Sequence, residues 1–250
     1  MQFESHYASH KGMVRESNQD SFYCSPEMGL FIVADGIGGK AGGEIASSMA
    51  IQVISKVFEE NLAHLMDKNR AYRQSFVSDA INAASLKIYE FSLAHPQYRG
   101  MGTTCTLLWV PPQGEWETRY ATTALIGHVG DSRCYLWRYG YLYQLTDDHS
   151  LINEQQKSGV LLKYAPAKNI ITRCVGYQQE EEVDTLMHEI EKGDVYLLCS
   201  DGLSNKVEPH ELSAMISNKD LKTSISDLIN LANERGGEDN ITLLGVKINS

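Results

Sequence analysis

The sequence predicts an α+β fold in which helices cover an antiparallel sheet or sandwich. Apolar residues recur at helical spacing in two separate blocks, 43–94 and 209–234, and short β-branched or apolar runs joined by turns lie between them. Adjoining strands with short turns form an antiparallel meander. Long helices kept apart from such a run of strands are typical of α+β proteins.

Each element follows from a local pattern. The first 25 residues are polar with scattered aromatic side chains, which indicates strands around the turn Lys11-Gly12. The apolar run 30–34 predicts a buried strand that ends at Asp35. Helices are expected, from apolar spacing, over 43–65, 72–94, 209–216 and 225–234, with a short polar one near 151–157. Further strands are expected over 103–110, 120–129, 133–137, 141–145, 183–188, 195–199 and 241–248.

Composition limits the class of protein. The 250 residues are 42% hydrophobic and 22% charged, which suits a globular protein with a substantial core. The net charge of -10 argues against nucleic acid or an anionic membrane surface as a partner. The five cysteines include no C-x-x-C pair, which indicates thiols in a reducing compartment. Without a secretory signal or a membrane-length apolar stretch, a cytoplasmic protein is expected, and we take it to act as a monomer.

Two Asp-Gly pairs follow apolar strands. Asp35-Gly36 ends the run 30–34, and Asp201-Gly202 ends the predicted strand 195–199. Each pair alone is more often an ordinary turn than a ligand. A carboxylate fixed at a strand end beside a bare carbonyl also suits a hard cation that takes oxygen ligands.

Three further aspartates, Asp20, Asp131 and Asp239, lie beside predicted strands. If the five converged, each pair about 4 Å apart would repel by roughly 4 kcal/mol at a protein surface. Such a cluster takes up protons or binds metal. Oxygen ligands without a nearby Cys or His set favour Mg(II) or Mn(II) over zinc.

Eight short motifs resemble, in order, those of metal-dependent type 2C protein phosphatases, and look most like the compact bacterial form. Each is weak alone, and their order along nearly the whole chain makes the resemblance specific. The motifs are Arg15-x-x-Asn18-Gln19-Asp20, Val33-Ala34-Asp35-Gly36-x-Gly38-Gly39, Gly102-Thr103-Thr104, Val129-Gly130-Asp131-Ser132-Arg133, Leu145-Thr146-x-Asp148-His149-Ser150, Ile171-Thr172-Arg173-x-x-Gly176, Cys199-Ser200-Asp201-Gly202-Leu203 and Glu238-Asp239-Asn240-Ile241-Thr242.

The resemblance implies a four-layer α-β-β-α sandwich. It also implies one catalytic domain over residues 1–250, with a flap subdomain at about 146–176 beside the active site. The implied activity is hydrolysis of phosphoserine and phosphothreonine in proteins, which reverses a bacterial Ser/Thr kinase. The alternative is a non-catalytic, phosphatase-like binding or regulatory module, which the intact set of aspartates argues against.

The resemblance also implies a binuclear centre of Mn(II) or Mg(II). Asp35 would bridge two ions, with the Gly36 carbonyl on one of them. Asp201 and Asp239 would hold the other ion, and Asp20 would support the pair directly or through water. Two such ions lower the pKa of a bridging water and clamp phosphoryl oxygens for in-line attack, so no cysteine or serine nucleophile is needed.

Beyond this pair, Asp131 with Asp201 matches the site of a third, weaker metal in bacterial members, and Arg15 matches the residue that grips the phosphate. Two positions depart from some family members. Ile37 stands where those members have a histidine that acts as general acid, and Gln19 stands where some have a glutamate.

Several other residues have open roles. His149 is either a flap residue near the substrate or a structural histidine, and Lys40 is either a solvated turn charge or a phosphate contact. Arg133 is expected to hold the loop after Asp131 through backbone or carboxylate hydrogen bonds. Core or sheet-face positions are expected for Trp109, Trp116 and Trp137.

Overall fold

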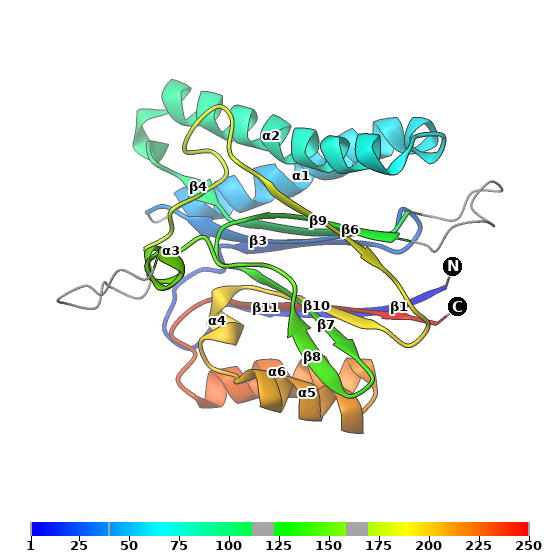
Figure 1. Ribbon diagram of the computed structural model, residues 1–250. Coiled ribbons are helices and arrows are strands. Elements are labelled where there is room, and N and C mark those ends of the chain that lie inside the picture. Colours follow the sequence, from blue (N-terminus) through cyan, green and yellow to red (C-terminus); the bar gives the residue numbers. More distant parts are fainter. Residues whose placement is uncertain (1, 40, 112–122, 159–169, 250) are drawn as a thin grey trace.

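The computed structural model describes residues 2–39, 41–111, 123–158 and 170–249. Two antiparallel sheets pack face to face, and a pair of helices covers the outer face of each (Figure 1). The layers therefore follow the order α-β-β-α. The predicted α+β class and four-layer sandwich are confirmed.

The two sheets differ in strand order. In the upper sheet of Figure 1 the order is β2-β3-β5-β6-β9, with the short β4 beside β3, and in the lower sheet it is β1-β11-β10-β7-β8. The last strand, β11, pairs with the first. The strands are β1 (Phe3–His10), β2 (Asp20–Ser25), β3 (Leu30–Ile37), β4 (Gly102–Thr103), β5 (Cys105–Trp109), β6 (Thr123–Val129), β7 (Arg133–Arg138), β8 (Tyr141–Gln144), β9 (Asp184–Glu189), β10 (Val195–Cys199) and β11 (Ile241–Ile248).

Two long helices cover the first sheet, and two shorter ones cover the second. Side chains fix where they start: the Asn69 side chain accepts a hydrogen bond from the Tyr72 N–H, and the Asp220 side chain accepts one from the Thr223 N–H. Such caps satisfy backbone donors of a first helical turn. The helices are α1 (Gly42–Met66), α2 (Arg70–Ala94), η1 (Pro96–Tyr98), α3 (Leu151–Ser158), α4 (Asp201–Ser204), α5 (Pro209–Asn218) and α6 (Leu221–Glu234).

The strand β3 is buried on both faces, which explains why its sequence shows no alternation of polar and apolar residues. Leu30, Ile32 and Ala34 belong to the core under α1 and α2. Phe31 and Val33 belong to the core between the two sheets. Packing on both sides therefore fixes the strand end that carries the first Asp-Gly pair.

Three details differ from the sequence prediction. The strand β3 continues two residues past Asp35, because Gly36 and Ile37 pair with β4. The run 103–110 divides at Thr104 into β4 and β5. The short helix α4 starts at Asp201, and four residues containing a glycine carry no helical periodicity that could have predicted it.

Several sequence predictions lie outside the described residues. They concern Lys40, Trp116, the turn at 111–114 beyond Pro111, the start of the strand at 120–122, and the middle of the flap at 159–169. Among the described tryptophans, Trp109 is fully buried and packs in the helix-covered core. Trp137 is partly buried against the core of the second sheet. The core or sheet-face prediction is confirmed for both.

Among the residues that the structure describes, no helix is both long enough and apolar enough to cross a membrane.

Candidate metal centre

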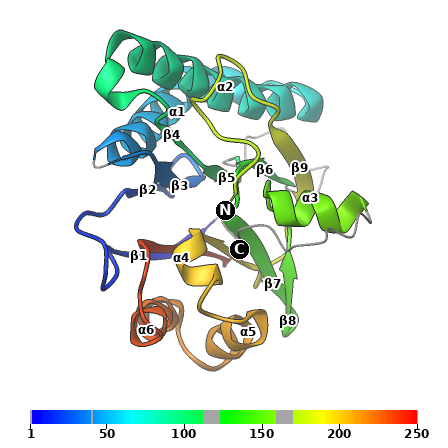
Figure 2. The ribbon, with the colours of Figure 1, turned by 90° about the vertical axis from the view of Figure 1, so that its left-hand side faces the viewer.

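The strands β3 and β10 finish at the same end of the sandwich, which faces the viewer in Figure 2, where β4 and α4 lie. Asp35 stands near the end of β3 and is paired across the sheet with Asp20, the first residue of β2. Gly36 follows in a tight place, since an added Cβ would lie 2.1 Å from the Gly43 carbonyl oxygen and 2.6 Å from that of Gln19. Only glycine leaves this backbone in position.

Two threonines hold the Asp35 backbone. The Thr104 N–H and the Thr103 hydroxyl donate to the Asp35 carbonyl oxygen at 2.9 and 2.8 Å. The Thr104 hydroxyl accepts from the Asp35 N–H at 2.9 Å and contacts the Ser132 hydroxyl at 2.8 Å. The Gly102-Thr103-Thr104 motif therefore positions the carboxylate, a role that the sequence alone did not predict.

On the second sheet, Asp201 follows β10 and starts α4. Its neighbour Ser200 donates a hydrogen bond from its hydroxyl to Asp20 Oδ2 at 2.8 Å and accepts one from the Thr242 N–H at 2.9 Å. Ser200 thus joins the ends of β10 and β11 to β2, and with them the carboxylates of both sheets.

The loop before β2 is tied to the start of β11 by Asn240. Its side chain accepts from the Gln19 N–H at 2.8 Å and donates to the carbonyl oxygens of Lys11 and Ser17, each at 2.9 Å. This brings Arg15 beside Asp239, with Nη2 and Oδ2 2.7 Å apart. The predicted phosphate-gripping arginine and a predicted metal ligand therefore lie side by side.

Gln19 turns toward the glycine loop. Its side-chain amide donates to the carbonyl oxygens of Gly38 and Gly39, each at 3.3 Å. The position at which some family members carry a glutamate thus holds the loop that follows Gly36 and leaves no carboxylate there.

These elements enclose a pocket of about 580 Å³. It brings together four of the five predicted aspartates with Arg15 and Ile37, whereas Asp20 lines a second pocket. The residues around the main pocket are Arg15, Glu16, Ser17, Gln19, Asp35, Gly36, Ile37, Gly38, Gly39, Asp131, Ile171, Asp201 and Asp239.

The crowded carboxylates have shifted pKa values. Burial, followed by the charges of Asp20, Asp201, Asp131 and Asp239, raises the pKa of Asp35 well above its usual value. Burial raises the pKa of Asp20 to about 7, although hydrogen bonds from the neighbouring hydroxyls lower it. Burial, and then the Asp201 charge, also raises the pKa of Asp131 to about 7. The pKa of Asp201 is raised by burial and by Asp239.

The residues present fit a divalent cation. Among the residues that the structure describes, Asp20 Oδ1 and Asp201 Oδ1 are buried and find no hydrogen-bond partner. A buried carboxylate oxygen without a partner is costly unless a cation or proton compensates it. The donors at the site are oxygens, the ligand type that Mg(II) and Mn(II) prefer.

The ligands do not form a closed cage: within the described ranges, no group of three or more His, Cys, Asp or Glu side chains is arranged to hold a metal by itself. Small hard cations keep several waters and share the site with substrate phosphates, so a sparse protein ligand set suits them.

Two other predicted residues lie beside this pocket. Arg133 binds the Asp148 carboxylate through two hydrogen bonds of 2.9 and 2.7 Å, so the predicted carboxylate contact is present and reaches the root of the flap. His149 is buried, 5% exposed, and bonded on both ring nitrogens, which favours the structural role over direct substrate contact.

The chain matches the model of the protein phosphatase 2C family over residues 8–243. It is 34% identical over 249 residues to the serine/threonine phosphatase stp of Listeria monocytogenes serotype 4b, covering 96% of this chain and 94% of that protein. Among solved structures, the serine/threonine phosphatase PstP/Ppp of Mycobacterium tuberculosis superimposes with a TM-score of 0.85 at 29% identity, covering 99% of each chain. A PstP catalytic domain in complex with two manganese ions has a TM-score of 0.82 at 30% identity, again covering 99% of each chain.

The chain therefore belongs to the protein phosphatase 2C family. The resemblance read from the eight motifs is confirmed, and so is the expectation of a phosphoprotein phosphatase.

Proposed function

We propose that this protein is a metal-dependent serine/threonine phosphatase that removes phosphate from phosphoserine and phosphothreonine in protein substrates. One observation carries the proposal: both sheets deliver carboxylates to a single pocket that also holds Arg15. Among the described residues, a buried oxygen of Asp201 in this pocket and one of Asp20, the strand partner of Asp35, have no hydrogen-bond partner. The related stp and PstP/Ppp proteins are named serine/threonine phosphatases, which supports the same substrate class.

In this proposal Asp35 would serve both of two Mn(II) or Mg(II) ions, the Gly36 carbonyl would help to hold one of them, and Asp201 and Asp239 would hold the other. Asp20 supports the pair, since it is paired with Asp35 and bonded to Ser200. When bound, such ions supply a water of lowered pKa and offset the charge of the phosphoryl oxygens. The PstP domain in complex with two manganese ions supports a site for two ions.

A third, weaker ion is proposed beside Asp131 and Asp201. Both carboxylates line the same pocket, and the charge of Asp201 raises the pKa of Asp131. A cation between them would relieve this repulsion.

Arg15 is proposed to orient the substrate phosphate. Its Nη2 donates to Asp239 Oδ2 and its Nε to the Glu238 carbonyl oxygen, which fixes the guanidinium at the pocket wall. A guanidinium carries five N–H donors, so further donors are available for a phosphate oxygen.

Ile37 lines the pocket and carries no proton to donate. We therefore propose that the leaving seryl or threonyl oxygen takes its proton from solvent in the open pocket and not from a side chain at this position.

The chain is proposed to act as one catalytic domain, with the flap at 146–176 selecting among phosphoproteins. A bacterial Ser/Thr kinase is the proposed opposing enzyme. We further propose that the protein acts as a monomer and works in the cytoplasm. The five free cysteines support the second point, because thiols stay reduced in that compartment.

The test is hydrolysis of p-nitrophenyl phosphate and of a phosphothreonine peptide with and without Mn(II). Turnover is expected with Mn(II), and EDTA should abolish it. Asp239→Asn should lose turnover while keeping its thermal unfolding transition. Full activity of the Asp239→Asn protein in its cellular role, or an inert wild type with Mn(II), would instead favour the non-catalytic module.

A further inference from the structure

His149 lies at the root of the flap, where the segment 146–176 leaves the sheets, and each of its polar groups makes a hydrogen bond. Its backbone N–H donates to the Gly130 carbonyl oxygen at 2.7 Å, and its carbonyl oxygen accepts from the Thr172 N–H at 2.9 Å. Its ring Nδ1 accepts from the Gly130 N–H at 3.1 Å, and Nε2 lies 3.1 Å from Asp184 Oδ2. One buried residue therefore connects both sides of the flap root to the turn after β6 and to the start of β9.

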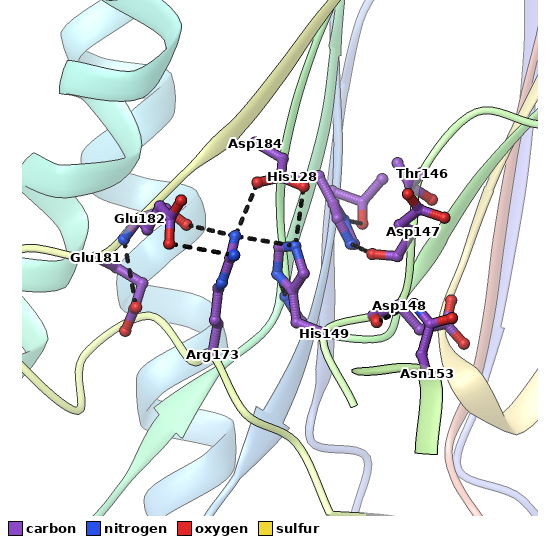
Figure 3. A network of polar contacts seen from close by, with 12 residues as sticks. His128, Thr146, Asp147, Asp148, His149, Asn153, Arg173, Glu181, Glu182 and Asp184 are labelled. Carbon is purple, nitrogen blue, oxygen red and sulfur yellow. Dashed lines mark hydrogen bonds and ion pairs between the residues drawn. The ribbon is translucent and has the colours of Figure 1, made fainter. Parts of the chain in front are cut away.

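These contacts fix the tautomer of the ring. The Gly130 N–H can only donate, so Nδ1 of His149 must accept and the ring proton must lie on Nε2. Figure 3 shows Asp184 in contact with both His149 and Arg173: Arg173 Nη1 donates to Asp184 Oδ1 at 2.8 Å and also lies 3.3 Å from His149 Nε2. Because Gly130 requires the lone pair on Nδ1, the protonated Nε2 accepts nothing from Arg173 and donates to Asp184 Oδ2. Asp184 is thus the acceptor that holds the Nε2–H tautomer, and Arg173, from the returning side of the flap, holds Asp184.

A second histidine, His128, packs against the His149 ring. The ring of His128 lies against that of His149 with centroids 4.8 Å apart. Its Nε2 lies 3.1 Å from the Asp147 carbonyl oxygen, and its Nδ1 lies 3.0 Å from the Thr106 hydroxyl. The His149 ring consequently has little room to turn away from its partners.

Gly130 forms a sharp turn in the backbone, called the corner below, that only glycine can adopt without strain. It has a φ of 109°, and an added Cβ would lie 2.5 Å from Thr104 Cγ2, so no other residue fits there without strain. His149 bonds both its N–H and its carbonyl oxygen. The next residue is Asp131, whose carboxylate lines the main pocket. The direction of that carboxylate therefore depends on how firmly the corner is held.

We propose that His149 is a positioning residue: by clamping Gly130 it aims the Asp131 carboxylate into the pocket, and Asp184 with Arg173 keeps its ring in the clamping tautomer. The proposal rests on the proposed function, since it takes Asp131 as the ligand of the third ion. It connects the flap to the third metal site through hydrogen bonds along Arg173–Asp184–His149–Gly130, and Asp131 is the residue that follows Gly130.

Two substitutions of His149 separate its ring nitrogens. In His149→Asn the side-chain oxygen can take the place of Nδ1 and accept from Gly130, but the side chain is too short to reach Asp184. In His149→Gln the amide can take the place of Nε2 and donate to Asp184, and nothing accepts from Gly130. If His149 had only a structural role, both variants would change Gly130 exchange and the Mn(II) requirement equally.

The first readout is hydrogen exchange of the Gly130 amide by NMR in the metal-free protein. Exchange is expected to speed up by up to about tenfold in His149→Gln, because one hydrogen bond is lost. It should remain close to wild type in His149→Asn. Equal exchange rates in wild type and His149→Gln would overturn the proposal.

The second readout is the Mn(II) concentration that gives half-maximal hydrolysis of p-nitrophenyl phosphate. His149→Gln should raise it by about 10-fold, in the range seen when a group that orients a metal ligand is removed. Asp131→Asn should raise it as well, and His149→Asn should leave it near the wild-type value. Equal rises in the Asn and Gln variants would show a structural role only and overturn the proposal.

Asp184 provides a test outside the buried core, because its side chain is half exposed. Asp184→Asn keeps an oxygen that accepts from Nε2–H and should preserve Gly130 protection, whereas Asp184→Ala should weaken it. This pair decides the proposal even if His149→Gln does not fold, since equal protection in both would contradict it. A wild type without Mn(II)-dependent hydrolysis would overturn the proposed function, while Gly130 exchange would still decide whether His149 holds the corner.

Discussion

Two regions border the same pocket and are held by different means. The aspartates at the ends of β3 and β10 are fixed by sheet hydrogen bonds and by cores on both faces of the strands. The root of the flap is held by a few backbone hydrogen bonds and by side-chain contacts such as Arg133 to Asp148 and Arg173 to Asp184. Parts of this second set are exposed to solvent; the Arg173 side chain is 26% exposed.

The difference suggests that the strand ends serve the chemistry of the site and that the flap serves the selection of substrates. Buried, tightly packed strand ends keep ligands in one geometry whatever substrate arrives. A flap held by a few polar contacts can change its sequence and position at small cost. We therefore expect substitutions at the strand ends to abolish turnover, whereas substitutions at the flap root other than those of His149 and its partners should mainly change how well a protein substrate is bound.

The largest effect is expected from Asp35→Asn. It removes the carboxylate that faces both proposed ions, and kcat should fall by more than about 100-fold, since removing even a group that only orients a ligand costs 10–100-fold. The metal-free protein should unfold at the same or a higher temperature, because burial disfavours the ionised form of Asp35 and asparagine cannot ionise. The measurement is kcat with Mn(II) together with thermal unfolding.

The matched control is Asp79→Asn, an exposed aspartate on α2. It should leave both quantities unchanged. A Asp35→Asn protein that retained wild-type kcat would contradict the assignment of the strand ends to catalysis.

The second effect is on the pH dependence of stability. In the folded protein the pKa values of Asp20 and Asp131 are raised to about 7. Their contribution to the stability of the metal-free protein is therefore fully present below the pKa that each has in the unfolded chain, and it is lost as pH rises through about 7. Mn(II) should compensate the ionised forms. The gain in unfolding free energy on adding Mn(II) should thus be larger at pH 8 than at pH 5.5, by about 2 kcal/mol.

Denaturant unfolding with and without Mn(II) at the two pH values measures this gain. A gain that is equal at both, or larger at pH 5.5, would contradict the link between these carboxylates and the metal.

A third, smaller effect is expected from Thr104→Val. The change leaves the Asp35 N–H and the Ser132 hydroxyl without their partner, which should lower the unfolding free energy by about 1–3 kcal/mol. Activity should fall as well, because the Asp35 backbone loses one of its supports. Denaturant unfolding checks the first part; a stability equal to wild type would show that the threonine is not needed to hold the strand end.

The smallest effect is expected from Arg133→Lys at the flap root. Lysine cannot make the two hydrogen bonds to Asp148, but only about 0.5–1 kcal/mol of stability should be lost at this partly exposed site. The KM for a phosphoprotein should change more than the kcat for p-nitrophenyl phosphate. A kcat loss as large as that of Asp35→Asn would remove the distinction between the two regions.

The strand ends were also the part of the site that the sequence predicted well. Apolar runs before Asp35 and Asp201 gave both the strands and the place where each carboxylate would emerge. The order of helices and strands gave the α+β class, because helical spacing and strand runs hardly overlap along this chain.

Contacts between distant segments could not be read in this way. Nothing local in the sequence pairs Arg15 with Asp239, and nothing local joins the His149 ring to Gly130. The support of Asp35 by Thr103 and Thr104 depends on β4 and β5 lying beside β3, a register that hydrophobic pattern alone does not specify. These contacts arise only when the sheets assemble, so folding determines them and local propensity does not.

The most direct test of the central claim is anomalous diffraction from crystals of the protein grown with Mn(II). We predict two strong manganese peaks in the pocket between Asp35, Asp201 and Asp239, with a weaker one beside Asp131. The same experiment on Asp35→Asn should show the paired peaks lost or greatly reduced. Manganese bound elsewhere, or a wild-type pocket without a peak in a preparation that is active with Mn(II), would contradict the account.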